Sequence, residues 1–420
     1  MQVQDNQSTT KKSWAVILFT GQLLLSLNDF YFSKLSFPVV PMFGTVLFIA
    51  ATLALPRPQL PESARKKHVT TLLGLGLSVL IFLSALWGLA AFKSATIKGP
   101  AGVGFGVLLF CITMLQEDNP EYKARLFRFL NAILAIHLLA WLVQYISIPL
   151  FHTYLDYLKP ITGMPSRYGF SYQGVSVNIV RCTGLFAEPA AYATFMFMGI
   201  SARMIRSGGK LRFFDLLLIV SIAGSMAITG FVLIFVCLAL WGWRSRRASA
   251  IWVTLLVLSS VGFVLVVMYS DLPVAQFIQL RLQTPSSDNS IRIRTQDALE
   301  GYTRLPESAQ IFGIGFGNYD VAEKVSNGLL NILIYLGMLG GPLVSIVFVG
   351  LLCQRRFPRS VWLFLMATLP FAPPFTLALW WLWIGQMVLY GQDTLRSQGK
   401  VKSAWAGAAV FSERTLSESG

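Results

Sequence analysis

Long stretches without charged residues recur along almost the whole sequence, and this pattern limits the possible folds most strongly. Only 13% of the residues are charged and 55% are hydrophobic, whereas a soluble domain carries roughly 25% charged residues. Inside a bilayer the backbone must bond to itself, so apolar runs of about 17–25 residues predict membrane-spanning helices. We therefore expect an all-α polytopic membrane protein with about 12 transmembrane helices. The predicted spans are residues 14–28, 35–55, 69–92, 99–115, 126–151, 185–202, 213–227, 229–243, 248–270, 328–352, 359–372 and 374–390.

The positions of the basic residues predict which way the chain is oriented. Lys and Arg stay on the cytoplasmic side of membrane proteins. With the N-terminus inside, 23 of the 34 basic residues fall in seven internal segments, and only Lys34, Lys93 and Lys98 fall in short outer loops. Both termini are thus expected inside (N-in, C-in), and the net charge of +15 reflects topology, so we expect no nucleic-acid partner. The predicted organisation is a tail at 1–12, a membrane domain at 13–394 and a tail at 395–420.

Two long segments remain on the outer face, at about residues 152–184 and 271–327. Long loops in compact proteins are usually functional or disordered. These two contain aromatic, Gly and Pro residues with mixed charge, so we expect them to be ordered.

The most unusual stretch is RCTGLFAEPAAYA, residues 181–193, where Arg181 precedes an apolar run and Glu188 lies within it. A buried carboxylate is costly unless it is paired or reaches water, and ionisable residues inside a membrane are usually functional. Continued as a helix, the segment would place the two side chains seven residues apart on nearly one face. Gly184 and Pro189 favour a broken or re-entrant segment that lines a cavity. The alternative is an Arg that reaches the membrane surface, paired with the carboxylate for structure only.

The second outer segment contains the arginine-rich stretch DNSIRIRTQDALEGYTRL, residues 288–305. Asp288 or Ser290 can cap a short helix that carries Arg292 and Arg294. Arginine suits bidentate binding of phosphate, so the stretch predicts an anionic headgroup or a diphosphate as ligand. An amphipathic helix lying on the outer leaflet has the same pattern.

The stretch FGIGFGNYD, residues 312–320, contains closely spaced glycines. As a nucleotide-binding loop the pattern is weak because no strand precedes it; a tight turn that brings backbone amides to a ligand is the other interpretation. We expect no metal and no cofactor, because the cysteines and histidines are dispersed. His137 is interpreted as a packed core residue.

Five stretches in this order resemble the polysaccharide polymerase and O-antigen ligase superfamily of bacterial inner membranes. The resemblance covers roughly residues 70–390, and the stretches are RCTGLFAEPAAYA (181–193), GSMAITGFVLIF (224–235), SIRIR (290–294), IFGIGFGNY (311–319) and NILIYLGMLG (331–340).

The resemblance implies a C-type glycosyltransferase-like helical fold with two large periplasmic loops. It implies a metal-independent polymerase of exopolysaccharide, capsule or O-antigen repeat units, acting on undecaprenyl-diphosphate-linked donor and acceptor glycans at the periplasmic face of the inner membrane. Arg181 and Arg292 would hold the departing diphosphate, and Glu188 would orient or deprotonate the acceptor hydroxyl. The further candidates for substrate binding are Arg294, Arg304, Arg167 and Asn318. Membrane lipids, a flippase and a chain-length regulator are the expected partners.

Two alternatives stay open. A ligase of the same fold would transfer glycan to the lipid A core, but ligases carry a His where this sequence has Ser326-Asn327, which favours the polymerase. A flippase or other transporter of lipid-linked oligosaccharide would be expected to show repeat symmetry between its halves and cationic residues deep in several spans. Here the outer arginines cluster in loops.

Overall fold

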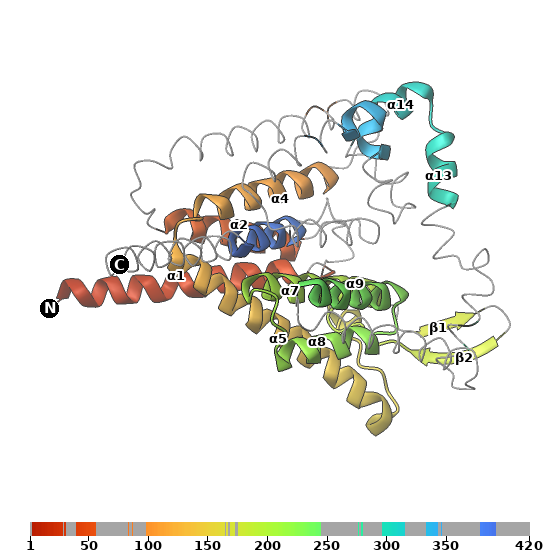
Figure 1. Ribbon diagram of the computed structural model, residues 1–420, viewed down its shortest axis with the longest axis horizontal. Helices are drawn as coiled ribbons and strands as arrows, with labels where there is room; N and C mark the ends of the chain where they lie inside the picture. The colour runs from red at the N-terminus through yellow and green to blue at the C-terminus, as the bar shows by residue number, and fades with distance from the viewer. Residues whose placement is uncertain are drawn as a thin grey trace, which may run out of the picture.

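The structure is a computed structural model that is mainly helical (Figure 1). The described residues are 2–27, 29–30, 39–55, 83, 86, 98–163, 165–166, 169–172, 175–244, 276, 279, 296–315, 333–342, 346 and 379–391. Its helices are α1 (Gln2–Ser26), α2 (Val39–Ala54), α4 (Lys98–Leu115), α5 (Pro120–Phe151), α6 (Lys159–Thr162), α7 (Pro189–Arg206), α8 (Phe213–Gly224), α9 (Ile228–Arg244), α13 (Gln296–Thr303) and α14 (Glu307–Phe312). Residues Leu333–Pro342 and 379–391 are also helical.

The helical class predicted from composition is confirmed. Nine of the twelve predicted spans overlap helices of the described residues, and the spans at 69–92, 248–270 and 359–372 lie almost entirely outside them. One described helix, Pro120–Phe151, is long and apolar enough to cross a membrane, and the other apolar helices found by the same criteria are shorter. The number of spans stays a prediction.

Helix α5 is the longest helix among the described residues, and its two ends have clear causes. Asn119 caps the start, because its side chain accepts a 3.0 Å hydrogen bond from the Tyr122 amide, and Pro120 occupies the first helical position. The helix ends at His152, whose φ of 50° is left-handed. Its 32 residues span about 48 Å at 1.5 Å per residue. One face is buried, through Leu126, Leu130, Ile133, Leu134, His137, Trp141 and Gln144.

Helices α1 and α2 pack through glycine. A Cβ on Gly21 would lie 2.7 Å from the Phe48 amide nitrogen, and a Cβ on Gly44 would lie 2.8 Å from the Gly21 carbonyl oxygen. The two backbones therefore approach too closely for any larger residue, which is the way small residues join helices in membranes.

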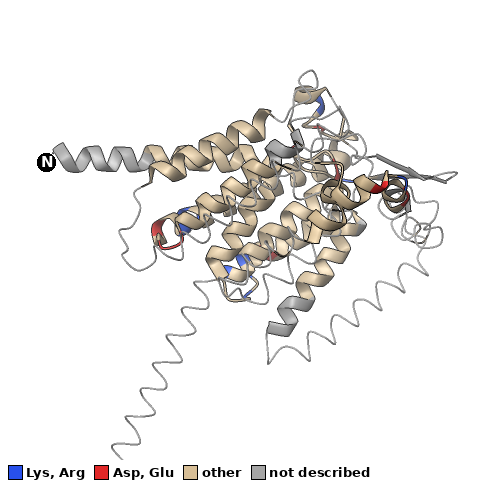
Figure 2. Ribbon diagram, turned by 90° about the horizontal axis from the view of Figure 1, so that it is seen from above, with Lys and Arg blue, Asp and Glu red and all other residues tan. Residues whose placement is uncertain are grey.

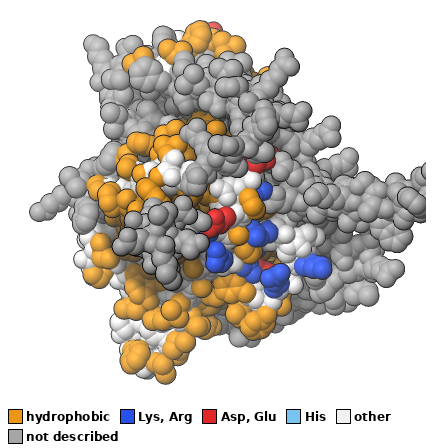
Figure 3. Space-filling model, turned by 90° about the vertical axis from the view of Figure 1, so that its left-hand side faces the viewer, with side chains coloured by type: hydrophobic (Ala, Val, Ile, Leu, Met, Phe, Trp, Pro, Cys, Tyr) orange, Lys and Arg blue, Asp and Glu red, His pale blue; other side chains and the backbone are white. Residues whose placement is uncertain are grey.

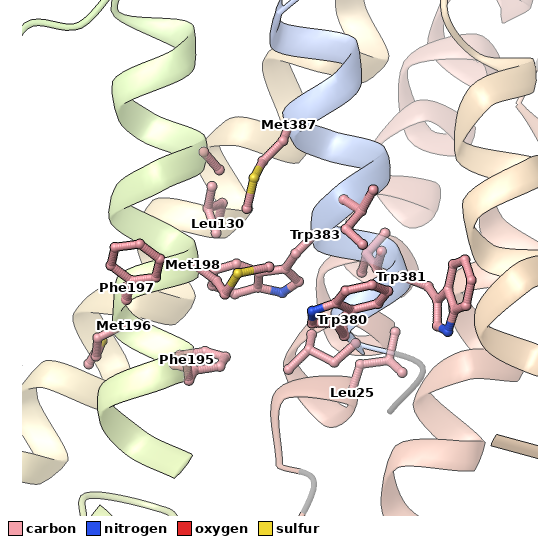
Figure 4. Packing of buried hydrophobic residues seen from close by; sticks show 14 of the residues in the cluster. Leu25, Leu130, Phe195, Met196, Phe197, Met198, Trp380, Trp381, Trp383 and Met387 are labelled. Carbon is pink, nitrogen blue, oxygen red and sulfur yellow. The ribbon is translucent and has the colours of Figure 1, made fainter. Parts of the chain in front are cut away.

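The core lies where α5, α7 and the helix at 379–391 meet (Figure 4). The rings of Phe195 and Trp383 are 4.8 Å apart between centroids, and both side chains are buried. Gly199 allows this packing, since a Cβ there would lie 2.4 Å from a Leu134 methyl group and 3.0 Å from the Trp383 ring. Figure 2 shows that the described charged residues gather near helix ends and connecting turns, so the middle of the bundle is almost free of charge.

The structure describes parts of the two long segments that were predicted on the outer face; that the whole of each is ordered stays a prediction. The first contains α6 and an antiparallel hairpin of β1 (Gly169–Tyr172) and β2 (Val175–Val180), with Gly169 opposite Val180. The second contains α13 and α14. Both lie toward the same side of the molecule, away from the beginning of α5 (Figure 1). The hairpin is an addition that the helical pattern did not predict.

Candidate functional site

The conspicuous stretch of the sequence, residues 181–188, forms an irregular loop between β2 and α7, which we call the site loop. The segment does not continue as a helix from Arg181, so the two side chains do not share one helical face. Helix α7 begins only at Pro189. A proline disfavours helical backbone in the residue before it, and Glu188 is extended, with φ −130° and ψ 142°. Gly184 turns the loop with a φ of 59°, so the backbone is broken here, as Gly184 and Pro189 predicted; that it lines a cavity stays a prediction.

Gln144 of α5 holds the site loop from within the bundle. Its Oε1 accepts hydrogen bonds from the amides of Thr183 (3.1 Å) and Gly184 (2.8 Å). Its Nε2 donates to the carbonyl oxygens of Gly184 (3.1 Å) and Leu155 (2.9 Å). The side chain is fully buried, and all four positions that an amide group offers are used. Gln144 therefore fixes the turn of the loop and joins it to the segment that follows α5.

The end of α1 holds the other half of the loop. Asp29 accepts a 2.7 Å hydrogen bond from the Ala187 amide, next to Glu188. The ring of His137 lies on Phe186, with centroids 5.1 Å apart, and its Nε2 lies 3.0 Å from Ser26 Oγ. His137 is fully buried, so its interpretation as a packed core residue is confirmed.

The segment after α5 supports the beginning of the loop. The Tyr154 hydroxyl lies 2.9 Å from Thr183 Oγ1 and also accepts a bond from Ser166 Oγ at 3.4 Å. Burial raises the pKa of Tyr154 above its ordinary value. The neighbouring Cys182 is buried, and this burial raises the pKa of its thiol from 9.0 to about 12. The thiol is thus neutral and unreactive at ordinary pH.

Arg181 and Glu188 lie at the two ends of this fixed loop, and both are half-buried. Glu188 stands at the start of α7, and its carbonyl oxygen accepts the Tyr192 amide as the first helical bond. The beginning of a helix carries partial positive charge, which favours a carboxylate there. The sequence singled out both residues correctly as part of an unusual segment, but it did not identify Gln144 or Asp29. Gln144 could have been noticed in the sequence because it is the one glutamine within the apolar run of α5.

The other predicted site residues are placed only in part. Arg304 follows α13, and its exposed side chain forms a 3.0 Å ion pair with Glu300 one turn earlier. The hydroxyl of Tyr302 donates to the Gln310 carbonyl and ties α13 to α14. Arg167, Arg292, Arg294 and Asn318 lie outside the described residues.

The glycine-rich stretch at 312–320 is explained, where described, by close backbone packing. The amides of Ile314 and Gly315 donate to the carbonyl oxygens of Ile334 and Tyr335, at 2.9 and 3.0 Å. These two amides are therefore bonded within the protein and do not face a ligand. Residues 316–320 lie outside the described residues, so contact of that part with a ligand stays a prediction. Gly337 of the helix Leu333–Pro342 has a φ of 68°, and a Cβ there would lie 2.4 Å from the Gly313 amide nitrogen, so this close approach requires glycine.

Comparisons with known proteins add no family to this description. The chain matches no model of a known protein family, and searches of curated proteins and of solved structures also return no match. Among the described residues, no three His, Cys, Asp or Glu side chains gather as metal ligands would; independence of metal stays a prediction.

Proposed function

We propose that the chain is a multi-pass protein of the bacterial inner membrane, with both termini inside. Two predicted cytoplasmic segments support this placement because they meet in the structure: Arg206 Nη1 donates to the Lys123 carbonyl at 3.2 Å. The site loop lies toward the other side of the molecule (Figure 1). Along α5, Arg128 and Phe151 are about 35 Å apart at 1.5 Å per residue, close to the roughly 30 Å of a hydrocarbon core.

In that membrane we propose that the protein polymerises undecaprenyl-diphosphate-linked oligosaccharide repeat units at the periplasmic face. One observation carries the proposal. An arginine and a glutamate flank an irregular loop that three separate parts of the chain hold in place, at the mouth of an apolar helix. Irregular backbone inside a membrane protein is tolerated where protein or a water-filled cavity surrounds it. The resemblance of this stretch to polysaccharide polymerases supports the same assignment.

The proposed reaction uses the residues of the site loop. The acceptor hydroxyl oxygen attacks the anomeric carbon of the donor, and the bond from that carbon to the diphosphate oxygen breaks. Glu188 takes the hydroxyl proton, and the lipid diphosphate leaves with the bonding electrons. Arg181, with Arg292, stabilises the negative charge that grows on the diphosphate where water is excluded. Substrate-binding roles for Arg294, Arg304, Arg167 and Asn318 belong to the same proposal.

The surface glycan of a deletion strain tests this function. Loss of a polymerase leaves single repeat units on the lipid carrier or on the core, and plasmid-borne wild-type protein restores long chains. Long chains that accumulate on undecaprenyl diphosphate would instead indicate a ligase. Repeat units that accumulate only on the cytoplasmic side would indicate a transporter, and the polymerase proposal would be abandoned.

A further inference from the structure

Basic side chains gather at the end of the molecule where α5 begins and α7 ends. We call Arg128, Arg206, Lys210 and Arg212 the basic end. Arg128 lies on α5, Arg206 is the last residue of α7, and the other two lie in the turn to α8. Figure 3 shows Lys and Arg side chains together on this face, with hydrophobic side chains beside them.

The basic end is a built feature of the packed bundle. The Arg206 guanidinium lies over the rings of Phe127 and Tyr390, at 4.3 and 5.2 Å from their centroids. In the turn, Ser207 Oγ donates to the Lys210 carbonyl at 2.7 Å, and the Gly209 amide donates to the Met204 carbonyl at 2.8 Å. These contacts fix the Arg206 side chain against α5 and shape the turn that carries Lys210 and Arg212.

Two acidic residues of this face are already paired with other basic residues. Glu121 forms a 2.6 Å ion pair with Arg125. Asp215 is buried and pairs with Arg203, and its other oxygen accepts the Arg212 amide at 2.8 Å. Within the described part of the chain, no carboxylate pairs with a side chain of the basic end. Its positive charge is therefore available to an anionic ligand.

An exposed apolar stripe on α8 begins directly beside this charge. Phe213 follows Arg212 in the sequence and is 75% exposed, and Val220 is 61% exposed two turns further along. Leu216 and Leu217 are exposed between them. The spacing i, i+3, i+4, i+7 places all four on one face of the helix. A ligand that fits must therefore offer negative charge at one end and an apolar chain at the other.

We propose that the basic end and the α8 stripe bind an anionic glycerophospholipid. Its phosphate lies against Lys210, Arg212 and Arg206, and one acyl chain lies along the stripe from Phe213 to Val220. Basic residues at the cytoplasmic surface attract anionic lipid headgroups, and arginine can bind a phosphate through two hydrogen bonds. The inference rests on the membrane placement proposed above and is independent of the glycan chemistry.

Native mass spectrometry of the full-length protein in detergent, with equal amounts of phosphatidylglycerol and phosphatidylcholine, tests the inference. The wild type is expected to retain phosphatidylglycerol preferentially. Each basic residue near the surface contributes about a fivefold change in affinity, so the double variant Lys210→Gln/Arg212→Gln should bind it about 30-fold more weakly. The control Lys98→Gln/Lys159→Gln removes the same charge from segments predicted on the outer face and should bind as the wild type does.

Three results would overturn the lipid site. They are equal retention of the two lipids by the wild type, equal losses in the two double variants, and complete displacement of the lipid by inorganic phosphate, which would indicate a site for phosphate alone. Because the double variant leaves the site loop untouched, glycan chain growth reports separately on the proposed function. A wild type that polymerises glycan but retains both lipids equally would refute the lipid site alone.

Discussion

Replacing Gln144 by methionine tests how the site loop is held. Methionine matches glutamine in length and packs well in an apolar core, but it makes none of the four hydrogen bonds to residues 155, 183 and 184. A net contribution of about 0.6–1 kcal/mol per bond predicts that the free energy of unfolding falls by about 2–4 kcal/mol. The change in structure should be confined to the site loop, because the rest of the buried α5 face is unchanged.

Two measurements on purified Gln144→Met protein check this expectation. Reversible unfolding in mixed micelles gives the change in the free energy of unfolding. Hydrogen exchange shows whether the amides of Thr183 and Gly184, which donate to Gln144 in the wild type, become less protected. Val143→Met is the matched control, since Val143 is the neighbouring residue and is 40% exposed, and its effect should stay within about 0.5 kcal/mol. If the Gln144→Met variant is as stable as the wild type and hydrogen exchange at both amides is unchanged, Gln144 does not hold the site loop.

Three further predictions address the loop, the glycine contact and the proposed chemistry. Because burial raises the pKa of Cys182 to about 12, its alkylation by maleimide should stay slow from pH 7 to pH 9 and become fast only after unfolding. The folded state, which favours the neutral thiol, should lose stability as the pH rises above 9.0 toward 12; fast labelling of native protein at pH 7 would contradict the burial. Gly337→Ala should lower the free energy of unfolding by about 3 kcal/mol, because φ is 68° and the new Cβ would lie 2.2 Å from the Ile311 carbonyl oxygen. The control Gly104→Ala meets nothing within 4 Å and should be neutral or slightly stabilising in a thermal unfolding assay. Arg181→Lys and Glu188→Gln should each strongly shorten the glycan on gels at normal membrane protein levels, whereas Arg125→Lys, in a surface ion pair with Glu121, should not; full-length glycan from both site variants would end the diphosphate mechanism.

The sequence predicted the helices because their signal is local. Apolar runs such as that of α5 are read from adjacent residues, and its start follows from Asn119 and Pro120. The basic segments around Lys123 and Arg206 were both predicted to be cytoplasmic; a hydrogen bond joins them, and their side of the membrane stays a prediction. Pro189 predicted the break before α7, since a proline disfavours helical backbone in the residue before it. The predicted span at 185–202 nevertheless began four residues before α7 does, because the apolar run starts ahead of the proline.

The contacts that shape the site could not be predicted in this way, because they join residues far apart in the chain. Ala187 bonds to Asp29 across 158 positions, and Gly184 to Gln144 across 40. The glycines of the 312–320 stretch show the same difficulty. A pattern of Gly residues indicates a close approach of backbone but not to what, and here Gly313 packs on the Tyr335 carbonyl, where a Cβ would lie 2.2 Å away.

The way the loop is held also bears on the proposed chemistry. Stabilising a charge that grows during a reaction requires groups that are already in position, because reorganising them would cost the energy that they supply. The turn at Gly184 is fixed by Gln144, and the backbone beside Glu188 is fixed by Asp29 from the end of α1. Both ends of the loop are thus positioned by the packed bundle. Since Ser26 ends α1 and Asp29 follows three residues later, we expect the first helix to be needed for the geometry of the site.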